Sequence, residues 1–256
     1  PVWYRGEEIY CGITSPAGDG WVQDQDTLDT WFSSGMWTFS TLGWPNTFKD
    51  GQKSDDLLKF HPTQVLETGY EILTLWVSRM IMMSLFALGE IPFEKVYLHG
   101  TILDAKGKKM SKSKGNAVDP FDALEEHGAD AIRWYFYSNS APWLPNRFHA
   151  DAVTEGQRKF MGTLWNTYAF YVLYANIDEF DPTKYSLEYD KLSVMDKWLL
   201  SRLNSCVKTV DDCLANYKIP ETTKALQAFV DDMSNWYVRR SRQRFWAKGM
   251  EQDKIN

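Results

Sequence analysis

Residues 64–103 read QVLETGYEILTLWVSRMIMMSLFALGEIPFEKVYLHGTIL, and this stretch decides the fold. Its beginning, residues 64–67, predicts a short strand. Residues 71–88 form a long apolar run that is typical of a helix, and Gly89 stands where such a helix ends. Residues 96–103 predict a second strand. This order predicts a βαβ unit, because a helix that is apolar nearly all round suits a crossover packed on a parallel sheet.

The segments on either side of this stretch differ in regularity. Residues 1–60 are expected to be irregular, because turn signals alternate there with short apolar pieces. On the other side, Asp119-Pro120 predicts a helix start, since Asp can cap a helix and Pro fits its first position. Two helices are expected to follow, with a break near Gly128.

The C-terminal part is expected to be helical throughout. The proline-containing segment 140–145 predicts a boundary. Beyond this segment the sequence predicts helices over residues 150–176, 192–217 and 219–247. The expected fold class is therefore α/β followed by all-α, with one domain over residues 1–143 and a second over residues 144–256.

The composition is that of a globular protein and does not by itself reveal a partner. Of the 256 residues, 44% are hydrophobic and 15% are aromatic, which is enough for a packed core. The net charge of −6 does not exclude nucleic acid, because an acidic protein can carry a basic face. The three cysteines form no C-x-x-C pair and have no histidine at zinc-ligand spacing. We therefore expect free thiols and no protein-bound metal.

The sequence also indicates where the protein resides. The apolar segment 72–88 is shorter than a bilayer span and contains Arg79, so it predicts a buried helix. The first residues, Pro1 to Arg5, include no initiator Met and no signal-peptide core, which indicates a chain that begins inside a domain. We expect a cytoplasmic protein without a membrane partner.

A loop rich in lysine, glycine and serine follows the second predicted strand, at the sheet edge where open α/β proteins bind ligands. Its lysines stand at positions 106, 108, 109, 112 and 114. Gly107 and Gly115 bracket this run and let backbone amides turn toward an anion, while Ser111 and Ser113 add hydroxyl donors. A solvated run of charges is the alternative interpretation. Together, however, these features predict a loop that can clamp a triphosphate.

Residues 109–113, Lys-Met-Ser-Lys-Ser, resemble the KMSKS signature of the class I aminoacyl-tRNA synthetases of the valine, isoleucine and leucine branch. The resemblance covers essentially the whole chain. It implies that the loop closes on the β- and γ-phosphates of ATP, with Mg²⁺ accompanying the nucleotide. It assigns catalysis to Lys109, Ser111, Lys112 and Ser113, with Lys112 as the main phosphate contact, and places Met110 at the ATP. Catalysis of this kind is positioning plus charge stabilisation.

Two further blocks resemble the parts of the family that bind ATP. Gly69 and Glu71 match the segment near the ribose, where glycine permits close approach and a carboxylate accepts hydroxyl hydrogen bonds. Family members mostly carry Asp at this place, and Glu71 could equally be a carboxylate favoured by a helix N-terminus. His99 and Gly100 match the segment near the adenine. A single histidine is more often structural than a ligand contact.

The resemblance also implies a pocket for the amino-acid side chain. Trp31 and Trp76 match positions that line it, and an apolar pocket suits a branched aliphatic substrate. Ile72 stands where the isoleucine enzyme typically has Gln, four residues before Trp76 on the same predicted helix face. It would narrow the pocket. The blocks similar to the valine enzyme are residues 33–34, 39–45 and 71–73.

Other parts of the chain favour isoleucine. The blocks similar to the isoleucine enzyme are residues 134–136, 164–168 and 235–242. The pocket selects the substrate and therefore carries more weight than these helical blocks. Valine is the expected amino acid, and isoleucine is the alternative.

Arginines and aromatic side chains alternate near the C-terminus. The arginines are Arg239, Arg240, Arg242 and Arg244, and the aromatic residues among them are Tyr237, Phe245 and Trp246. This combination suits RNA, since charges hold phosphates and flat rings stack on unpaired bases. A helix with one basic face and buried aromatic side chains is the alternative. By resemblance, residues 144–256 are a helical-bundle anticodon-binding domain for tRNA, and residues 1–143 are the C-terminal part of a Rossmann-type parallel-sheet catalytic domain.

Two family features are not found in the sequence. There is no H-x-G-H signature, and there is no editing domain. We therefore expect this chain alone neither to activate amino acids efficiently nor to edit. Two other functions stay open: a non-catalytic RNA-binding remnant of a synthetase, and a nucleotidylyltransferase with a similar loop. The arginine-rich helices argue against the second.

Overall fold

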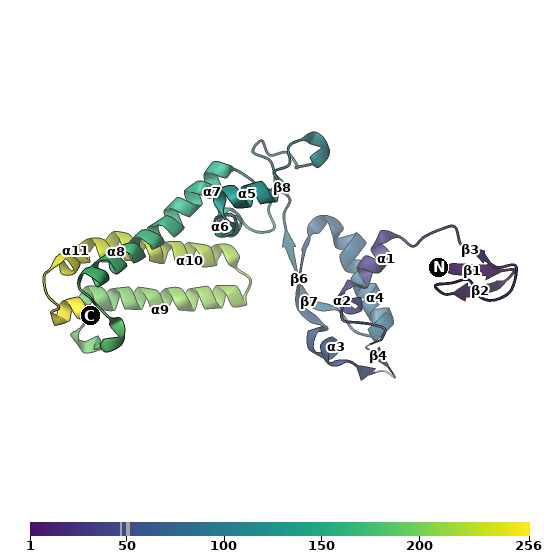
Figure 1. Ribbon diagram of the computed structural model, residues 1–256, viewed down its shortest axis with the longest axis horizontal. Coiled ribbons are helices and arrows are strands. Elements are labelled where there is room, and N and C mark those ends of the chain that lie inside the picture. The colour runs from purple at the N-terminus through teal and green to yellow at the C-terminus, as the bar shows by residue number, and fades with distance from the viewer. Residues whose placement is uncertain (47, 50–51) are drawn as a thin grey trace. The chain divides into compact units, whose positions relative to one another are not determined.

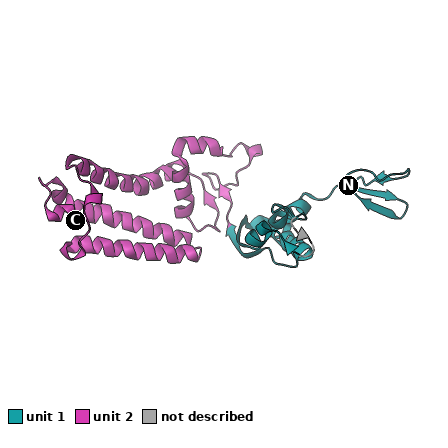
Figure 2. Ribbon diagram, turned by 60° about the horizontal axis from the view of Figure 1, so that its bottom comes forward, with its two compact units in different colours: residues 1–98 teal, residues 99–256 magenta. Residues whose placement is uncertain are grey.

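A computed structural model describes residues 1–46, 48–49 and 52–256 of the chain. The chain forms two compact units, Pro1–Leu98 and His99–Asn256 (Figure 2).

The first unit begins with a small antiparallel sheet in the order β2-β1-β3. Its strands are β1 (Val2–Arg5), β2 (Glu8–Cys11) and β3 (Val22–Gln23). Between β1 and β2, Gly6 has a φ of 63°, a conformation that glycine adopts without steric cost. The expectation of irregular structure over residues 1–60 is therefore wrong at this end. A single glycine was too weak a turn signal to reveal strands of four residues.

Short helices and a hairpin occupy much of the remainder of residues 1–60. They are α1 (Thr30–Gly35), α2 (Trp37–Ser40), the hairpin of β4 (Phe48–Lys49) and β5 (Gln52–Lys53), and α3 (Asp55–Phe60). The side chain of Asp29 caps α1 by accepting a hydrogen bond from the Trp31 amide at 3.2 Å. Ser54 caps α3 through the Leu57 amide.

The predicted strand–helix–strand unit is present in the first unit (Figure 1). β6 (Thr63–Gly69) and β7 (Phe93–His99) are hydrogen-bonded neighbours in one sheet. The connection between them is the 3₁₀ turn η1 (Tyr70–Ile72), the π-helical η2 (Leu73–Val77) and the α-helix α4 (Ser78–Leu88). Gly89 ends α4 in the left-handed conformation with a φ of 75°, as predicted. The single regular helix expected over residues 71–88 is thus three helical segments.

A small core joins the sheet to this helical connection. Leu66 of β6, Val77 and Met80 of the helix, and Phe93 of β7 form its buried cluster. Trp76 packs against this cluster and is itself half-buried.

The outer side of α4 is not buried. Phe86 is 92% exposed and Met82 is 67% exposed. The expectation of a buried helix over residues 72–88 is therefore wrong for the described part of the chain, because the core cluster contacts one side of the helix. By length and composition alone, the stretch Tyr70–Leu88 is the one described helix that could cross a membrane, a test that core helices of soluble proteins also pass.

The second unit begins with a parallel pair of short strands, β8 (Ile102–Leu103) and β9 (Asn146–Arg147). The strand predicted over residues 96–103 is therefore interrupted, because β7 ends at His99 and the Gly100 amide bonds to the Pro142 carbonyl at 2.7 Å.

Two helices lie between β8 and β9 along the chain, α5 (Pro120–His127) and α6 (Ala129–Asn139). Asp119 caps α5 and accepts a hydrogen bond from the Phe121 amide at 2.8 Å, with Pro120 in the first turn. The predicted helix start and the break at Gly128 are both confirmed.

Helices make up most of the rest of the second unit (Figure 1). They are α7 (Ala150–Gly156), η4 (Gln157–Gly162), α8 (Thr163–Ile177), η5 (Pro182–Lys184), η6 (Tyr189–Lys191), α9 (Val194–Ala215), α10 (Ile219–Asp231), η7 (Asp232–Val238), α11 (Arg239–Trp246) and α12 (Gln252–Ile255). Ser193 and Asp196 cap α9 with reciprocal side-chain-to-backbone bonds. The predicted order, an α/β part followed by a helical part, is confirmed.

Candidate functional site

The lysine loop, residues 104–116, starts directly after β8 and is closed at its base by Asp104. One carboxylate oxygen of Asp104 accepts hydrogen bonds from the amides of Lys106 at 2.9 Å and Lys108 at 2.8 Å. The other oxygen accepts a hydrogen bond from the side-chain amide of Asn116 at 2.8 Å. Asp104 therefore binds the first residues of the loop, through the amides of Lys106 and Lys108, and also its last residue, Asn116.

Asn116 continues this arrangement into the signature. Its side-chain oxygen accepts a hydrogen bond from the Ser111 amide at 3.0 Å, and its side-chain nitrogen donates to the Lys109 carbonyl at 3.3 Å. These two backbone groups flank Met110. The Asn116 side chain thus fixes the backbone at the point where the signature residues begin.

The turn of the signature is held by its own small residues. The hydroxyls of Ser111 and Ser113 lie 2.7 Å apart, and residues Lys112–Lys114 form the 3₁₀ turn η3. Gly115 ends this turn in the left-handed conformation, with a φ of 65°. The two predicted phosphate lysines, Lys109 and Lys112, are both exposed on this loop.

Met110 is turned toward the protein. It is half-buried and, with Val118, Ala123 and Phe148, lines a cavity of about 540 Å³ beneath the loop. This placement seats the loop on α5 and on the segment after β9.

Hydrogen bonding lowers the pKa of Asp104, at the base of the loop. The side-chain bond from Asn116 and the amide of Lys108 hold the pKa of Asp104 below its ordinary value. Asp104 is therefore a carboxylate at neutral pH, beneath a loop that carries five lysines.

The residues predicted to contact the nucleoside lie in separate units. In the first unit, Gly69 ends β6 and Glu71 is exposed in the short turn η1. In the second unit, His99 Nδ1 lies 3.0 Å from the Gly100 carbonyl oxygen. A Cβ on Gly100 would lie 2.2 Å from the carbonyl oxygen of Leu144, so the backbone approach that requires glycine here is to the chain itself.

Trp76, a predicted pocket residue, is hydrogen-bonded to the helix α1, which carries the predicted pocket residue Trp31. The Trp76 indole donates a hydrogen bond to the Ser34 carbonyl at 2.9 Å, and Arg79 forms an ion pair with Asp29 at 2.9 Å. The helical segment of Trp76 is thus joined to α1, which carries Trp31.

Ile72 does not sit on a regular α-helix. It ends the 3₁₀ turn η1 with a φ of −111° and a ψ of 16°, and Trp76 follows in the π-helical segment. The regular α-helix predicted to carry both Ile72 and Trp76 is therefore not observed, because the helix changes type between them.

Three of the four predicted RNA-binding arginines are exposed: Arg239, Arg240 and Arg242. The guanidinium of Arg240 lies 4.6 Å from the ring centroid of Trp236, whose side chain is about half exposed. We call this surface, Trp236 with the three exposed arginines of α11, the basic helix. A cation and a flat ring are thus presented together at its start.

Arg244 has a different role. It pairs with Asp196 at 2.7 Å and Asp253 at 3.0 Å, and also donates to Tyr237 and Ser193. These contacts occupy all five N–H groups of its guanidinium. Arg244 therefore links α11 to α9 and α12 within the bundle. Its guanidinium is engaged in these contacts, so the prediction that it binds RNA is wrong.

The same cluster perturbs the ionisation of its members. Burial alone would raise the pKa of Asp196, but hydrogen bonds from Arg244, Tyr237 and Ser193 outweigh it and lower the pKa to about 2. Burial and the bond to Asp196 raise the pKa of Tyr237 above its ordinary value.

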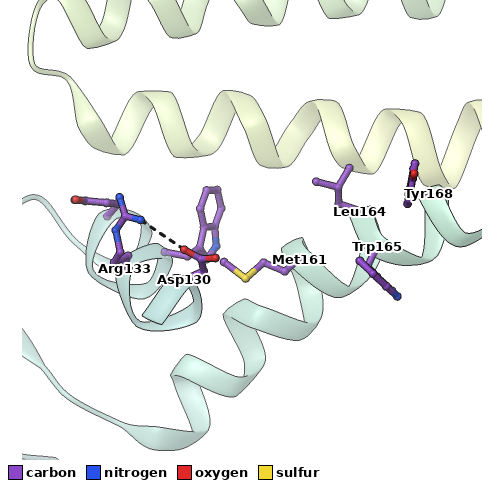
Figure 3. A pocket seen from close by; sticks show the side chains of 8 residues that line it. Asp130, Arg133, Met161, Leu164, Trp165 and Tyr168 are labelled. Carbon is purple, nitrogen blue, oxygen red and sulfur yellow. Dashed lines mark ion pairs between the residues drawn. The ribbon is translucent and has the colours of Figure 1, made fainter. Parts of the chain in front are cut away.

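A second aromatic surface lies between α6 and α8, around a hollow of about 710 Å³ (Figure 3). Its lining residues are Asp130, Arg133, Trp134, Tyr137, Met161, Leu164, Trp165 and Tyr168. The Trp134 ring stacks on Phe160 with centroids 3.7 Å apart, whereas Trp165 is 70% exposed.

Among the residues that the structure describes, no group of three or more His, Cys, Asp or Glu is placed to hold a metal ion.

Two family models match the chain. The model of tRNA synthetases class I (I, L, M and V) matches residues 9–144, which is more than half of the chain. The chain belongs to the class I tRNA synthetases. The model of the anticodon-binding domain of tRNA ligase matches residues 196–256, which include the basic helix.

Curated relatives of two specificities match this class I chain. The isoleucine–tRNA ligase of Clostridium novyi (strain NT) is 45% identical over 95% of the chain and 23% of its own length. The valine–tRNA ligase of Staphylococcus carnosus (strain TM300) is 43% identical over 94% of the chain and 27% of its own length. The chain thus spans about a quarter of the curated relatives it matches. The family is of the isoleucine and valine type, and these two identities do not separate the amino acids.

Solved structures share the fold. The LeuRS of Agrobacterium radiobacter K84, in a ternary complex with tRNA and LeuAMS, has a TM-score of 0.69 at 21% identity, over 87% of this chain and 28% of that one. The methionyl-tRNA synthetase of Mycobacterium tuberculosis, bound by methionyl-adenylate, has a TM-score of 0.64 at 19% identity, over 83% of this chain and 40% of that one.

Sequence reasoning found the lysines of this class I loop and missed the residues that shape it. Asp104 and Asn116 were not among the predicted site residues, although Asp and Asn are the side chains that most readily bond to nearby backbone. An Asp after a strand and an Asn after a glycine, at the two ends of one loop, were the available signal.

Proposed function

We propose that this chain supplies the triphosphate-binding loop and the tRNA-binding helices of a ligase that activates valine with ATP and esterifies it to tRNA. The observation that carries the proposal is the lysine loop. Its base is closed by Asp104 and Asn116, and Lys109 and Lys112 are exposed between them. Family membership supports the reaction class.

In the proposed reaction, the amino-acid carboxylate attacks the α-phosphorus of ATP and pyrophosphate leaves. Negative charge grows on the departing β- and γ-phosphates. The ammonium groups of Lys112 and Lys109 stabilise that charge, and the hydroxyls of Ser111 and Ser113 donate hydrogen bonds to phosphate oxygens. A loop that is already shaped loses little entropy on receiving the nucleotide.

We expect Mg²⁺ to arrive bound to the phosphates of ATP. The groups proposed to meet the phosphates are ammonium groups and hydroxyls, and both oxygens of Asp104 are hydrogen-bonded within the loop, whereas Mg²⁺ prefers anionic oxygen ligands, which the phosphates of ATP supply. The loop residues fit a phosphate and do not fit a metal ion.

The choice of valine rests on the pocket residues Trp31, Ile72 and Trp76. Trp76 is fixed to the α1 block by its bond to Ser34, and Ile72 adds a β-branched and therefore stiff side chain nearby in the sequence. Isoleucine is the alternative substrate, and the isoleucine–tRNA ligase of Clostridium novyi has the slightly higher identity, 45% against 43% for the valine–tRNA ligase of Staphylococcus carnosus.

The partner proposed for the second unit is the tRNA that accepts this amino acid. Arg239, Arg240 and Arg242 would hold its phosphates, and Trp236 offers a face on which an unpaired base can stack. The match of residues 196–256 to the anticodon-binding domain supports this assignment.

The test is ATP–pyrophosphate exchange by the complete ligase that contains this chain, with valine and isoleucine as separate substrates. We expect exchange with both and a higher kcat/KM for valine. A higher value for isoleucine would transfer the proposal to that amino acid. Absence of exchange, with tRNA binding intact, would favour a non-catalytic tRNA-binding remnant.

A further inference from the structure

We infer that Asp104 and Asn116 are positioning residues that hold the lysine loop in the shape that receives the triphosphate. The inference rests on the proposed function and extends it to two residues outside the signature. Neither side chain presents a cation to a phosphate. Both act through the backbone of the residues that do.

Each oxygen of Asp104, and both the oxygen and the nitrogen of the Asn116 side-chain amide, take part in a hydrogen bond. Asp104 accepts from two amides on the ascending side of the loop and from Asn116 on the descending side. Asn116 then bonds to the Ser111 amide and the Lys109 carbonyl. Two side chains thereby fix backbone groups between Lys106 and Ser111, and their mutual bond joins the two ends of the loop. We call this set of bonds the clasp.

Asp104 also brings a negative charge to a loop rich in lysine. Lysines at 106, 108, 109, 112 and 114 repel one another, and a loop of free conformation would spread them apart. The carboxylate of Asp104 sits beneath them, and the side-chain bond from Asn116 and the amide of Lys108 keep it ionised. The clasp therefore places one negative charge at the base of a loop that carries five lysines, which lowers their mutual repulsion.

Asp104 and Asn116 are complementary, because Asp104 accepts the hydrogen bond that Asn116 donates. With Asn116→Asp, a second carboxylate would face Asp104 across a contact of 2.8 Å, and the donor to Lys109 would be lost. With Asp104→Asn, two amide NH₂ groups would face each other at the same contact. Each single exchange breaks the clasp with almost no change in side-chain volume.

The double exchange, Asp104→Asn with Asn116→Asp, restores complementarity. The new amide oxygen at position 104 can accept from the amides of Lys106 and Lys108, and its NH₂ group can donate to the new carboxylate at position 116. The other carboxylate oxygen can accept from the Ser111 amide. Only the bond to the Lys109 carbonyl is lost.

The experiment measures pyrophosphate exchange in the complete ligase for both single variants, the double variant and Asp119→Asn. Asp119 lies just outside the loop, and its exchange removes the same charge while keeping a good helix cap. We expect each single variant to lower kcat/KM for ATP by roughly tenfold to a hundredfold, with the KM for the amino acid unchanged. The double variant should recover most of this loss, and Asp119→Asn should match the unmodified ligase.

Two outcomes overturn the inference: single variants that behave like Asp119→Asn, or a double variant no better than the worse single one. Lys112→Ala separates this failure from that of the proposed function. If Lys112→Ala slows exchange while the clasp variants do not, only the clasp is rejected. If Lys112→Ala is also without effect, the loop does not hold the triphosphate.

Discussion

Arg244 Nη1 lies 2.7 Å from Asp196 Oδ1 and joins α11 to the start of α9. Both side chains are largely buried, with 13% of Arg244 and 5% of Asp196 exposed. We predict that Arg244→Ala lowers the free energy of unfolding by roughly 3–5 kcal/mol, because it leaves a buried carboxylate without its counter-ion. Urea unfolding of the chain measures this, with the exposed Arg242→Ala as the control that should change little. Equal stability of the two variants would contradict the structural role of Arg244.

The ionisation of Asp196 predicts an acid-sensitive bundle. Its pKa falls from an ordinary value of 3.8 to about 2 on folding, so the folded state binds fewer protons than the unfolded state at low pH. The stability from this group is therefore complete above about pH 4 and declines as the pH falls toward 2. Unfolding free energies measured from pH 5 to pH 2 should show this decline, and Asp196→Asn should flatten it. A slope unaffected by Asp196→Asn would contradict the prediction.

The basic helix predicts salt-dependent tRNA binding. Replacing Arg239, Arg240 and Arg242 together with Ala should weaken binding and reduce the slope of log K against log salt by roughly one unit for each lost phosphate contact. The measurement is a titration of tRNA at several salt concentrations.

A matched control for this prediction removes the same charge elsewhere. Lys159, Lys184 and Lys191 are exposed and each pairs with an acidic residue nearby in the sequence. Their combined exchange for Ala should leave both affinity and slope nearly unchanged. If both triple variants lose the same affinity, net charge explains the binding and the basic helix does not.

The signature lysine predicts a kinetic effect limited to ATP. In the complete ligase, Lys112→Ala should slow adenylate formation by roughly tenfold to a hundredfold, because a charge-assisted phosphate bond contributes about 1.5–3 kcal/mol. Valine binding should be spared. Lys106→Ala, on the same loop but outside the signature, should have a smaller effect in the same pyrophosphate-exchange assay. Equal rates for Lys112→Ala and the unmodified ligase would refute the assignment.

The pocket predicts a change of specificity. If Ile72 forms a wall of the valine pocket, Ile72→Ala should raise kcat/KM for isoleucine relative to valine, by up to roughly the 1–3 kcal/mol that one methylene contributes. Leu75→Ala removes a side chain of the same size from the next helical segment and serves as the control. A ratio that moves equally in both variants would show that Ile72 does not face the substrate.

The features predicted correctly from the sequence are those set by local chemistry. Gly89 ends its helix because only glycine adopts the left-handed conformation without strain, and Asp119-Pro120 starts one because cap and ring geometry suit that position. Such signals act over a few residues and can be read directly.

The features that were missed depend on residues distant in the sequence. Arg244 looks like one more arginine for RNA until Asp196, forty-eight positions earlier, is seen to face it. The hydrophobicity of α4 predicts burial, but exposure depends on which layers cover the helix. The change from 3₁₀ to π-helix at Ile72 also leaves no mark in a pattern of apolar residues.

The segment before β8 and the segment before β9 lie side by side, because β8 and β9 are parallel neighbours. The Gly100 amide bonds to the Pro142 carbonyl, the Asn146 amide bonds to the Thr101 carbonyl at 3.0 Å, and a side chain at position 100 would strike the backbone of Leu144. In protein-engineering terms, the intervening residues form a cassette with adjacent ends. The signature loop could therefore be exchanged between synthetases together with α5 and α6, by joining the new segment at Gly100 and at Asn146. Any residue larger than glycine at position 100 would push the two ends of this segment apart.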